Sequence, residues 1–404
     1  MLRACGETYL GTKPVDVAAS QLQNGDGVLF APTKREGIDY DSACYFQRFV
    51  RVSSNNPDGN VSGMGVSFTQ STVSTKFGLT ATAAIAPGKF VAGVAGSTPE
   101  VVLFTEVSRD GDAVEEDFYG DEAPGGEEIM EMQVQRLRGG EKCQGSSLTA
   151  SASAACSNGQ GTVFLGNSNG TLWSVELEDS GRMECVSSGA IPGLPSGVPI
   201  SCMAAVSGPV AAAVAVHTVV MLDFRVAKPA VQPVMVMKGE DPMDPIRCID
   251  CCGTDLILGS EQGTIFTFDI RALANGEKLM QSVPGSGNYA RPMYRSRTSK
   301  RPLTSLVAVS PSSFVSANAV GELLQWCPES NRSAAEHAIF PFGFFPINDT
   351  ARAGAQIDRA GQFGAPEWQC QHLGNPRYVA GTRLFGGQAV AFVEETGLLQ
   401  VYSF

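Results

Sequence analysis

One serine in this 404-residue chain has neighbours with the spacing of a catalytic motif. The segment Gly166–Gly170 (GNSNG) matches the G-x-S-x-G pattern, in which a hydrolase presents its nucleophile on a turn between a strand and a helix. The residues on both sides of this segment predict strands, and GSEQG at 259–263 occupies the same place in a similar hairpin. We therefore expect a strand–turn–strand unit here and no nucleophile.

Cysteine is the other residue type that could carry chemistry. Cys248, Cys251 and Cys252 have a spacing that metal sites use, but they alternate along a predicted strand, and no second pair of ligands lies near them in sequence. Cys370-Gln371-His372 is an equally incomplete set, and the chain has only three histidines. We predict buried thiols at 248–252, and we expect no catalytic residue, no metal and no cofactor.

Composition narrows the possible partners. The net charge of −12 argues against nucleic acid and against an anionic membrane surface, because both require a basic protein face. The first residues lack the apolar core of a signal peptide, and the longest apolar run, Val210–Val216, is too short to cross a bilayer. Eleven cysteines at scattered spacings fit reduced thiols in the cytosol or nucleus. We expect no direct nucleic-acid contact, no membrane insertion and no small-molecule ligand.

The elements that would position these residues are short strands. Residues 246–271 predict three of them, and a tight turn joins the last two at Gly263, where a positive φ is needed. The segment closes on Phe268-Asp269, a large aromatic residue followed by Asp. This is the pattern of the WD repeat with Phe in place of Trp.

The same pattern recurs along the chain. Six further segments align on the position of Phe268, and their anchor residues are Phe46, Phe104, Val175, Leu222, Trp326 and Tyr402, of which Phe46 fits least well. The shortest spacings between anchors approach the ~40–45 residues of a four-stranded propeller blade. We therefore predict an all-β fold, a seven-bladed WD40-like β-propeller that residues 1–404 form as a single domain. A β-sandwich with regular hairpins, or a ring of six or eight blades, would be the alternative.

The two ends of the chain are expected to meet. The last predicted strand, a third strand, ends at Tyr402, and the sequence stops two residues later at Phe404, so we expect the last blade to lack its fourth strand. An unpaired strand edge invites aggregation. We predict that the N-terminal stretch around Glu7–Lys13 completes this blade and closes the ring.

Three insertions interrupt the repeats. Residues 108–145, which begin with the strongly acidic stretch 108–131, predict a disordered insertion, and residues 283–302 and 328–380 predict irregular loops. Two of the insertions contain candidate partner-binding residues, namely Arg291, Arg295 and Arg297 in a basic stretch and Phe342 and Phe344 in an apolar island. The alternatives are a solvated loop for the arginines and packing against the rim for the phenylalanines.

Residues 217–271 resemble the fourth and fifth blades of the small single-propeller nucleoporin of the nuclear pore's outer-ring Y-complex. The resemblance depends on the tripeptide Asp223–Arg225, on Cys248–Asp250 and on the tripeptide Asp269–Arg271. It implies a scaffold subunit in the nucleus, at the nuclear envelope, that docks on other nucleoporins during protein and mRNA transport and has no catalytic residues. Phe268 in place of Trp and the acidic insertion are departures from that family.

Two other functions remain open from the sequence. WD-repeat substrate receptors of cullin-RING ubiquitin ligases often carry an aromatic-Asp-x-Arg ending in consecutive blades, and Arg225 and Arg271 are so placed. The simpler interpretation is that each Arg pairs locally with a turn Asp or with backbone. An enzyme would need polar residues that converge on a central channel, whereas the predicted innermost strands, such as Leu303–Val309, are mostly apolar.

Overall fold

The computed structural model describes most of the predicted strands and leaves out the greater part of the insertions. The residues that it describes are 3–33, 45–54, 65–95, 100–107, 131–138, 152–158, 161–178, 183–191, 194, 197–207, 210–223, 232–238, 244–270, 280–281, 289–290, 294–297, 301–310, 313–326, 368–371 and 377–404. In this part of the chain, no helix is long and apolar enough to cross a membrane.

The described residues form seven four-stranded antiparallel sheets, here called sheets I to VII. Sheet I contains β2 (Ala18–Gln21), β3 (Gly27–Ala31), β4 (Tyr45–Ser54) and β5 (Val66–Thr75). Sheet II contains β6 (Leu79–Ala86), β7 (Lys89–Val94), β8 (Glu100–Val107) and β9 (Glu131–Arg138). Sheet III contains β10 (Ala152–Ser157), β11 (Thr162–Asn167), β12 (Thr171–Leu177) and β13 (Met183–Ala190). Sheet IV contains β14 (Cys202–Ser207), β15 (Val210–Ala215), β16 (Thr218–Asp223) and β17 (Gln232–Lys238).

The remaining sheets include one that both ends of the chain build. Sheet V contains β18 (Ile246–Cys252), β19 (Asp255–Ser260), β20 (Thr264–Asp269) and β23 (Tyr294–Arg297). Sheet VI contains β24 (Leu303–Ser310), β25 (Ser313–Asn318), β26 (Glu322–Trp326) and β27 (Trp368–Gln371). Sheet VII contains β28 (Tyr378–Leu384), β29 (Ala389–Glu394), β30 (Leu398–Ser403) and the N-terminal β1 (Arg3–Tyr9). A short ribbon of β21 (Met280–Gln281) and β22 (Tyr289–Ala290) stands apart from them.

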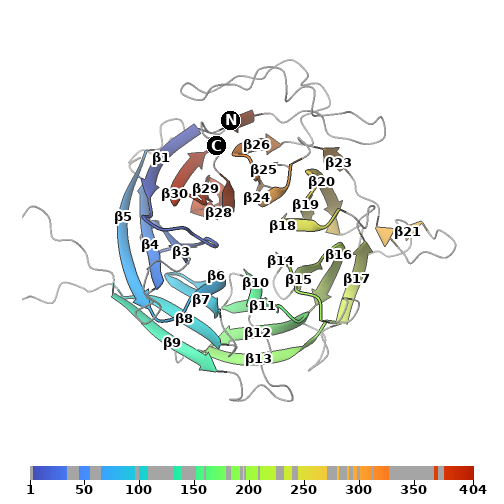
Figure 1. Ribbon diagram of the computed structural model, residues 1–404, viewed down its shortest axis with the longest axis horizontal. Helices are drawn as coiled ribbons and strands as arrows, with labels where there is room; N and C mark the ends of the chain where they lie inside the picture. Colours follow the sequence, from blue (N-terminus) through green and yellow to red (C-terminus); the bar gives the residue numbers. More distant parts are fainter. Residues whose placement is uncertain are drawn as a thin grey trace, which may run out of the picture.

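The sheets are arranged around a common centre, and in each of them the strand that comes first in the order above lies innermost (Figure 1). Seven clusters of buried apolar side chains join each sheet to the next one along the chain, and one of these clusters joins sheet VII back to sheet I. The core therefore lies between the sheets and not within any one of them. This all-β arrangement is compatible with a β-propeller.

Aromatic side chains dominate the contact between sheets I and II. Phe30 and Phe49 stack with ring centroids 4.5 Å apart, and Phe104 and Phe90 of sheet II lie 4.9 and 5.4 Å from Phe30. All four side chains are fully buried. Burying a Phe side chain contributes roughly 1.5–3 kcal/mol, so this group is a major part of the contact.

The prediction that the two termini share a sheet is confirmed. Strand β1 pairs antiparallel with β30 from Arg3↔Ser403 to Tyr9↔Leu398. The pairing strand is Arg3–Tyr9, a few residues before the predicted Glu7–Lys13. Buried Tyr402 and Gln400 lie on β30, and the amide of Gln400 reaches the carboxylate of Glu7 on β1 at 3.5 Å.

The seven anchors lie in the third strands of seven different sheets, but one of them is misplaced. The anchors Phe104 and Phe268 pair with the second residue of the preceding strand, namely Phe90 and Leu256. In sheet I the equivalent residue, Val28, pairs with Arg51 and not with Phe46. Strand β4 is ten residues long and begins near Phe46, so the aromatic residue that was aligned lies at the wrong end of the strand.

The predicted ranges of the three insertions are too long, because each of them includes a strand. Strand β9 lies within 108–145, β23 within 283–302, and β27 within 328–380, so these parts are not loops. Each is the outermost strand of its sheet. Such a strand needs few apolar residues because backbone hydrogen bonds to one neighbour hold it, and composition therefore hides it. The acidic stretch 108–130 lies outside the described residues.

Candidate functional site

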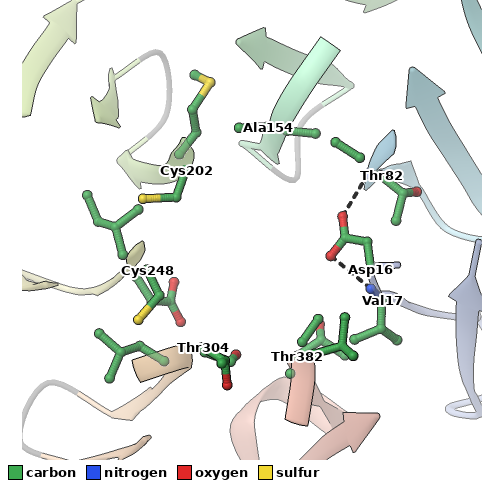
Figure 2. A pocket seen from close by; sticks show the side chains of 18 of the residues that line it. Asp16, Val17, Thr82, Ala154, Cys202, Cys248, Thr304 and Thr382 are labelled. Carbon is green, nitrogen blue, oxygen red and sulfur yellow. Dashed lines mark hydrogen bonds between the residues drawn. The ribbon is translucent and has the colours of Figure 1, made fainter. Parts of the chain in front are cut away.

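The innermost strands enclose a central cavity of about 360 Å³. Its lining includes residues of sheets II to VII and Val15–Val17, which precede sheet I, and Figure 2 shows Asp16, Thr82, Cys248 and Thr382 around it. A second cavity of about 440 Å³, between sheets I, II, III and VII, shares several lining residues with the first, among them Thr82 and Arg383. The two cavities therefore adjoin near the axis of the sheets.

The cavity is more polar than the sequence predicted. Four charged side chains line it, namely Asp16, Arg247, Asp250 and Arg383, together with several Ser and Thr hydroxyls. The innermost strands are mostly apolar in sequence, as predicted, but many of their apolar side chains pack between sheets and leave polar side chains at the cavity. On β18, for example, Ile246 and Cys251 pack between sheets IV and V, whereas Arg247 and Asp250 line the cavity.

Asp16 lies two residues before β2 and connects sheets I and II. Its carboxylate accepts hydrogen bonds from the backbone N–H of Val17 at 2.8 Å and from that of Thr82, on β6, at 2.9 Å (Figure 2). Burial raises the pKa of Asp16 to about 6, although these two hydrogen bonds oppose the shift. A carboxyl group with such a pKa is suited to acid–base chemistry, but here both oxygens already accept backbone donors.

Asp250 repeats this arrangement between sheets V and VI. Its carboxylate accepts hydrogen bonds from the backbone N–H of Cys251 at 2.8 Å and of Ala308, on β24, at 2.7 Å. A guanidinium nitrogen of Arg383, from sheet VII, lies 3.9 Å from Oδ1. Burial raises the pKa of Asp250, whereas Arg383 and the two hydrogen bonds act in the opposite direction.

The cysteines of β18 behave as core residues. Cys248 and Cys251 are buried and Cys252 is half-buried, and all three are free thiols. Burial raises the pKa of Cys251 to about 12 and that of Cys248 well above its ordinary value, so both stay protonated at neutral pH. The prediction of buried thiols is confirmed for these two residues. Over the described ranges, no group of three or more His, Cys, Asp or Glu side chains has an arrangement that could hold a metal.

The serine motif is a hairpin, as predicted. Gly166 lies in β11 and Thr171 begins β12, and the turn between them is closed by a hydrogen bond from Gly170 N to Asn167 O at 3.1 Å. Gly170 adopts a φ of 80°, which explains the glycine. No helix follows Ser168, so the strand–turn–helix context of a nucleophile elbow is missing at this position.

The partner-binding residues that we predicted are not at the cavity. Arg295 and Arg297 lie in β23, the outer strand of sheet V, where their backbones pair with Phe266 and Thr264. Arg225, Arg271, Arg291, Phe342 and Phe344 lie outside the described residues. These assignments therefore stay predictions.

Sequence reasoning missed Asp16 and Arg383. A single acidic residue inside or just before an otherwise apolar strand is the signal that could have found both carboxylates. Asp250 in CIDCC shows the same signal. Nothing in the sequence around Arg383 indicates that it approaches Asp250, because the two residues belong to sheets that are not neighbours.

Comparisons with known proteins give a fold and no family. No family model matches the chain, and no curated protein matches it either. Among solved structures, the chain is similar to Raptor of Chaetomium thermophilum, with a TM-score of 0.58 and 11% identity. The likeness concerns the fold alone. It covers 99% of this chain but only 28% of Raptor, and 984 chains of solved structures match, so the architecture is common and does not single out an activity.

Proposed function

We propose that this chain is a closed, seven-bladed WD40-type β-propeller that serves as a non-catalytic docking subunit of a large protein assembly. Seven sheets, seven inter-sheet apolar clusters and the pairing of β1 with β30 support the closed ring. A body of this kind offers two faces and a rim that keep their shape when partners bind.

The observation that carries the non-catalytic proposal is the bonding of the cavity carboxylates. Asp16 and Asp250 each accept two backbone N–H groups, one of them from the neighbouring sheet. A general acid or base must lie within hydrogen-bond reach of the proton that it transfers to or from a substrate, whereas these two carboxylates are held against backbone donors of neighbouring sheets. Carboxylates that hold neighbouring sheets together are better suited to stabilising a scaffold.

We propose further that the assembly is the outer ring of the nuclear pore complex, with the nucleoporins of the Y-complex as partners and the nuclear envelope as the location. The support is the resemblance of residues 217–271 to the fourth and fifth blades of the small Y-complex nucleoporin. The structure places Asp223 at the end of β16, and Cys248 and Asp250 on β18, in two consecutive sheets. The cullin-receptor alternative depends on Arg225 and Arg271, which lie outside the described residues.

The test is purification of the tagged full-length chain from cells, with the associated proteins identified by mass spectrometry. Scaffold nucleoporins in the eluate and a nuclear-rim signal of the tagged protein are the expected results. A cullin adaptor in their place, or a diffuse signal, would contradict the nuclear-pore proposal.

A pair of charge-matched variants makes the test specific. Arg295→Glu with Arg297→Glu changes the predicted partner-binding strand, whereas Lys13→Glu with Arg377→Glu makes the same change in charge at two exposed sites elsewhere. We expect the first variant to lose the nucleoporins and the second to keep them. Equal recovery with both variants would exclude β23 as the docking strand.

A further inference from the structure

The outer strand of sheet I differs from the other outer strands in its composition. Strand β5 has the sequence VSFTQSTVST, ten residues with neither a charge nor a proline. The outer strands of the other sheets carry charged residues or are only four residues long, as seen in EMQVQRLR (β9), MECVSSGA (β13), QPVMVMK (β17), YRSR (β23), WQCQ (β27) and RACGETY (β1).

Strand β5 also pairs without a register shift over more residues than any other outer strand described. All ten of its residues pair with β4, from Tyr45↔Thr75 to Ser54↔Val66, and the register does not shift. The pairings of β1, β13 and β17 each contain a register shift. Charges, prolines and bulges are the devices by which proteins keep the outer edge of a sheet from pairing with another chain. Strand β5 has none of the three.

The edge of β5 is accessible while its faces are held in place. Val66 and Phe68 pack against the apolar cluster between sheets VII and I, and the amide of Gln70 donates a hydrogen bond to the backbone oxygen of Tyr9 at 3.2 Å. Ser67, Thr69, Gln70, Thr72 and Ser74 are exposed. Of the described strands, only β4 hydrogen bonds with β5 in the sheet, and β5 lies at the rim (Figure 1). Within the described part of the chain, the outer edge of β5 has no paired strand and can pair with a strand of another chain.

We propose that β5 pairs antiparallel with β5 of a second copy of this chain, so that the two sheets I become one continuous sheet across a two-fold axis. A second copy brings an edge of the same length, twist and regularity. Every antiparallel register opposes only uncharged residues, including Thr and Ser pairs and aromatic with β-branched pairs, which are favourable across strands. A two-fold contact of this kind closes on itself and does not propagate into a fibre.

The charge of the protein predicts how this dimer responds to salt. Each copy carries a net charge of −12, so two copies repel one another over distances that salt screens. The β5 contact itself contains no ion pair that salt would weaken. Dimerisation should therefore become stronger as the salt concentration rises.

The test uses the full-length chain and sedimentation velocity over a wide range of concentrations, at low and at high salt. Two copies related by a two-fold axis perpendicular to the joined sheet have one residue directly opposite itself, and the register that places Gln70 opposite Gln70 overlaps residues 66–74 of each copy. Gln70→Lys and Gln70→Glu each place like charges together at this point and should weaken the dimer roughly tenfold or more. An equimolar mixture of the two variants should restore a heterodimer. The matched controls are Gln23→Lys and Gln23→Glu, at an exposed turn residue, and these should dimerise like the unmodified chain.

Recovery in the mixture also shows that both variants fold, because misfolded chains would not regain the contact. A monomer at every concentration and in high salt would overturn the proposal and leave the edge to a different protein. A dimer that persists equally in Gln70→Lys and in Gln23→Lys would overturn it as well, because the contact would then lie elsewhere.

Discussion

Asp16 and Asp250 each link two adjacent sheets through backbone hydrogen bonds, and they differ in whether a cationic side chain lies nearby. Each carboxylate lines the central cavity and accepts one backbone N–H from the next residue and one from the innermost strand of the adjacent sheet. Asp250 has the guanidinium of Arg383 within 3.9 Å. Among the described residues, no charged neighbour contributes to the pKa of Asp16, and burial raises that pKa to about 6. The backbone donors fix the position of each carboxylate, whereas a neighbouring cation lowers the free energy that is needed to bury its negative charge.

The contact between sheets I and II, which Asp16 links, also contains a group of buried phenylalanines. Removing one of these rings should give the largest loss in the free energy of unfolding. Phe30→Ala leaves a cavity among Phe49, Phe90 and Phe104, which surround the missing ring. We expect a loss of about 3–5 kcal/mol in the free energy of unfolding, measured by urea denaturation. Phe30→Leu fills much of the space and should lose clearly less. An equal loss from both variants would show that cavity volume is not the cause.

Removing a carboxylate should be the next largest effect. Asp250→Ala leaves the N–H groups of Cys251 and Ala308 without their acceptor and removes the anion beside Arg383. We expect unfolding to require about 2–4 kcal/mol less free energy, because buried donors lose their partners. Asp250→Asn keeps one acceptor oxygen and should lose less. If Asp250→Ala were as stable as the unmodified chain, the carboxylate would not be a tie between sheets V and VI.

The charge of Asp16 should make stability depend on pH. Its folded pKa of about 6 lies above the ordinary value of 3.8, so the folded state holds a proton that the unfolded state has released. The stability that the group contributes is therefore present below pH 4 and is lost as the pH rises from about 4 to about 6. Compared with Asp16→Asn, the unmodified chain should lose about 2–3 kcal/mol across that window.

Parallel pH profiles of the free energy of unfolding for the two proteins provide the measurement. If the difference between Asp16→Asn and the unmodified chain did not change with pH, the pKa of Asp16 would not be raised.

Arg383 should give the smallest effect. Its side chain is 41% exposed and its ion pair with Asp250 is long, so Arg383→Ala should lose no more than about 1 kcal/mol, and less in high salt. The variant should also raise the pKa of Asp250 further, which NMR titration of the carboxyl carbons would detect. An unchanged pKa would mean that the two groups do not interact in solution.

The sequence predicts the sheets well and the cavity poorly, for a physical reason. Gly170 and Gly263 mark the hairpins because a positive φ is a local requirement, and the anchors Phe268 and Trp326 mark third strands because large residues pack between sheets. Whether Asp16 or Arg383 faces the axis depends on the positions of several sheets relative to one another. The four residues of β27 are hidden for another reason, since WQCQ has no pattern of its own and is a strand only because β26 pairs with it.

Truncation of β1 tests whether the two ends of the chain close the proposed ring. Removal of residues 1–9 uncovers the edge of β30 and takes away the hydrogen bonds from Arg3↔Ser403 to Tyr9↔Leu398. We predict a melting temperature several degrees lower and faster amide hydrogen exchange in β30, with little change in β11 and β12 of sheet III. An unchanged melting temperature with full protection of β30 would contradict closure by the N-terminal strand.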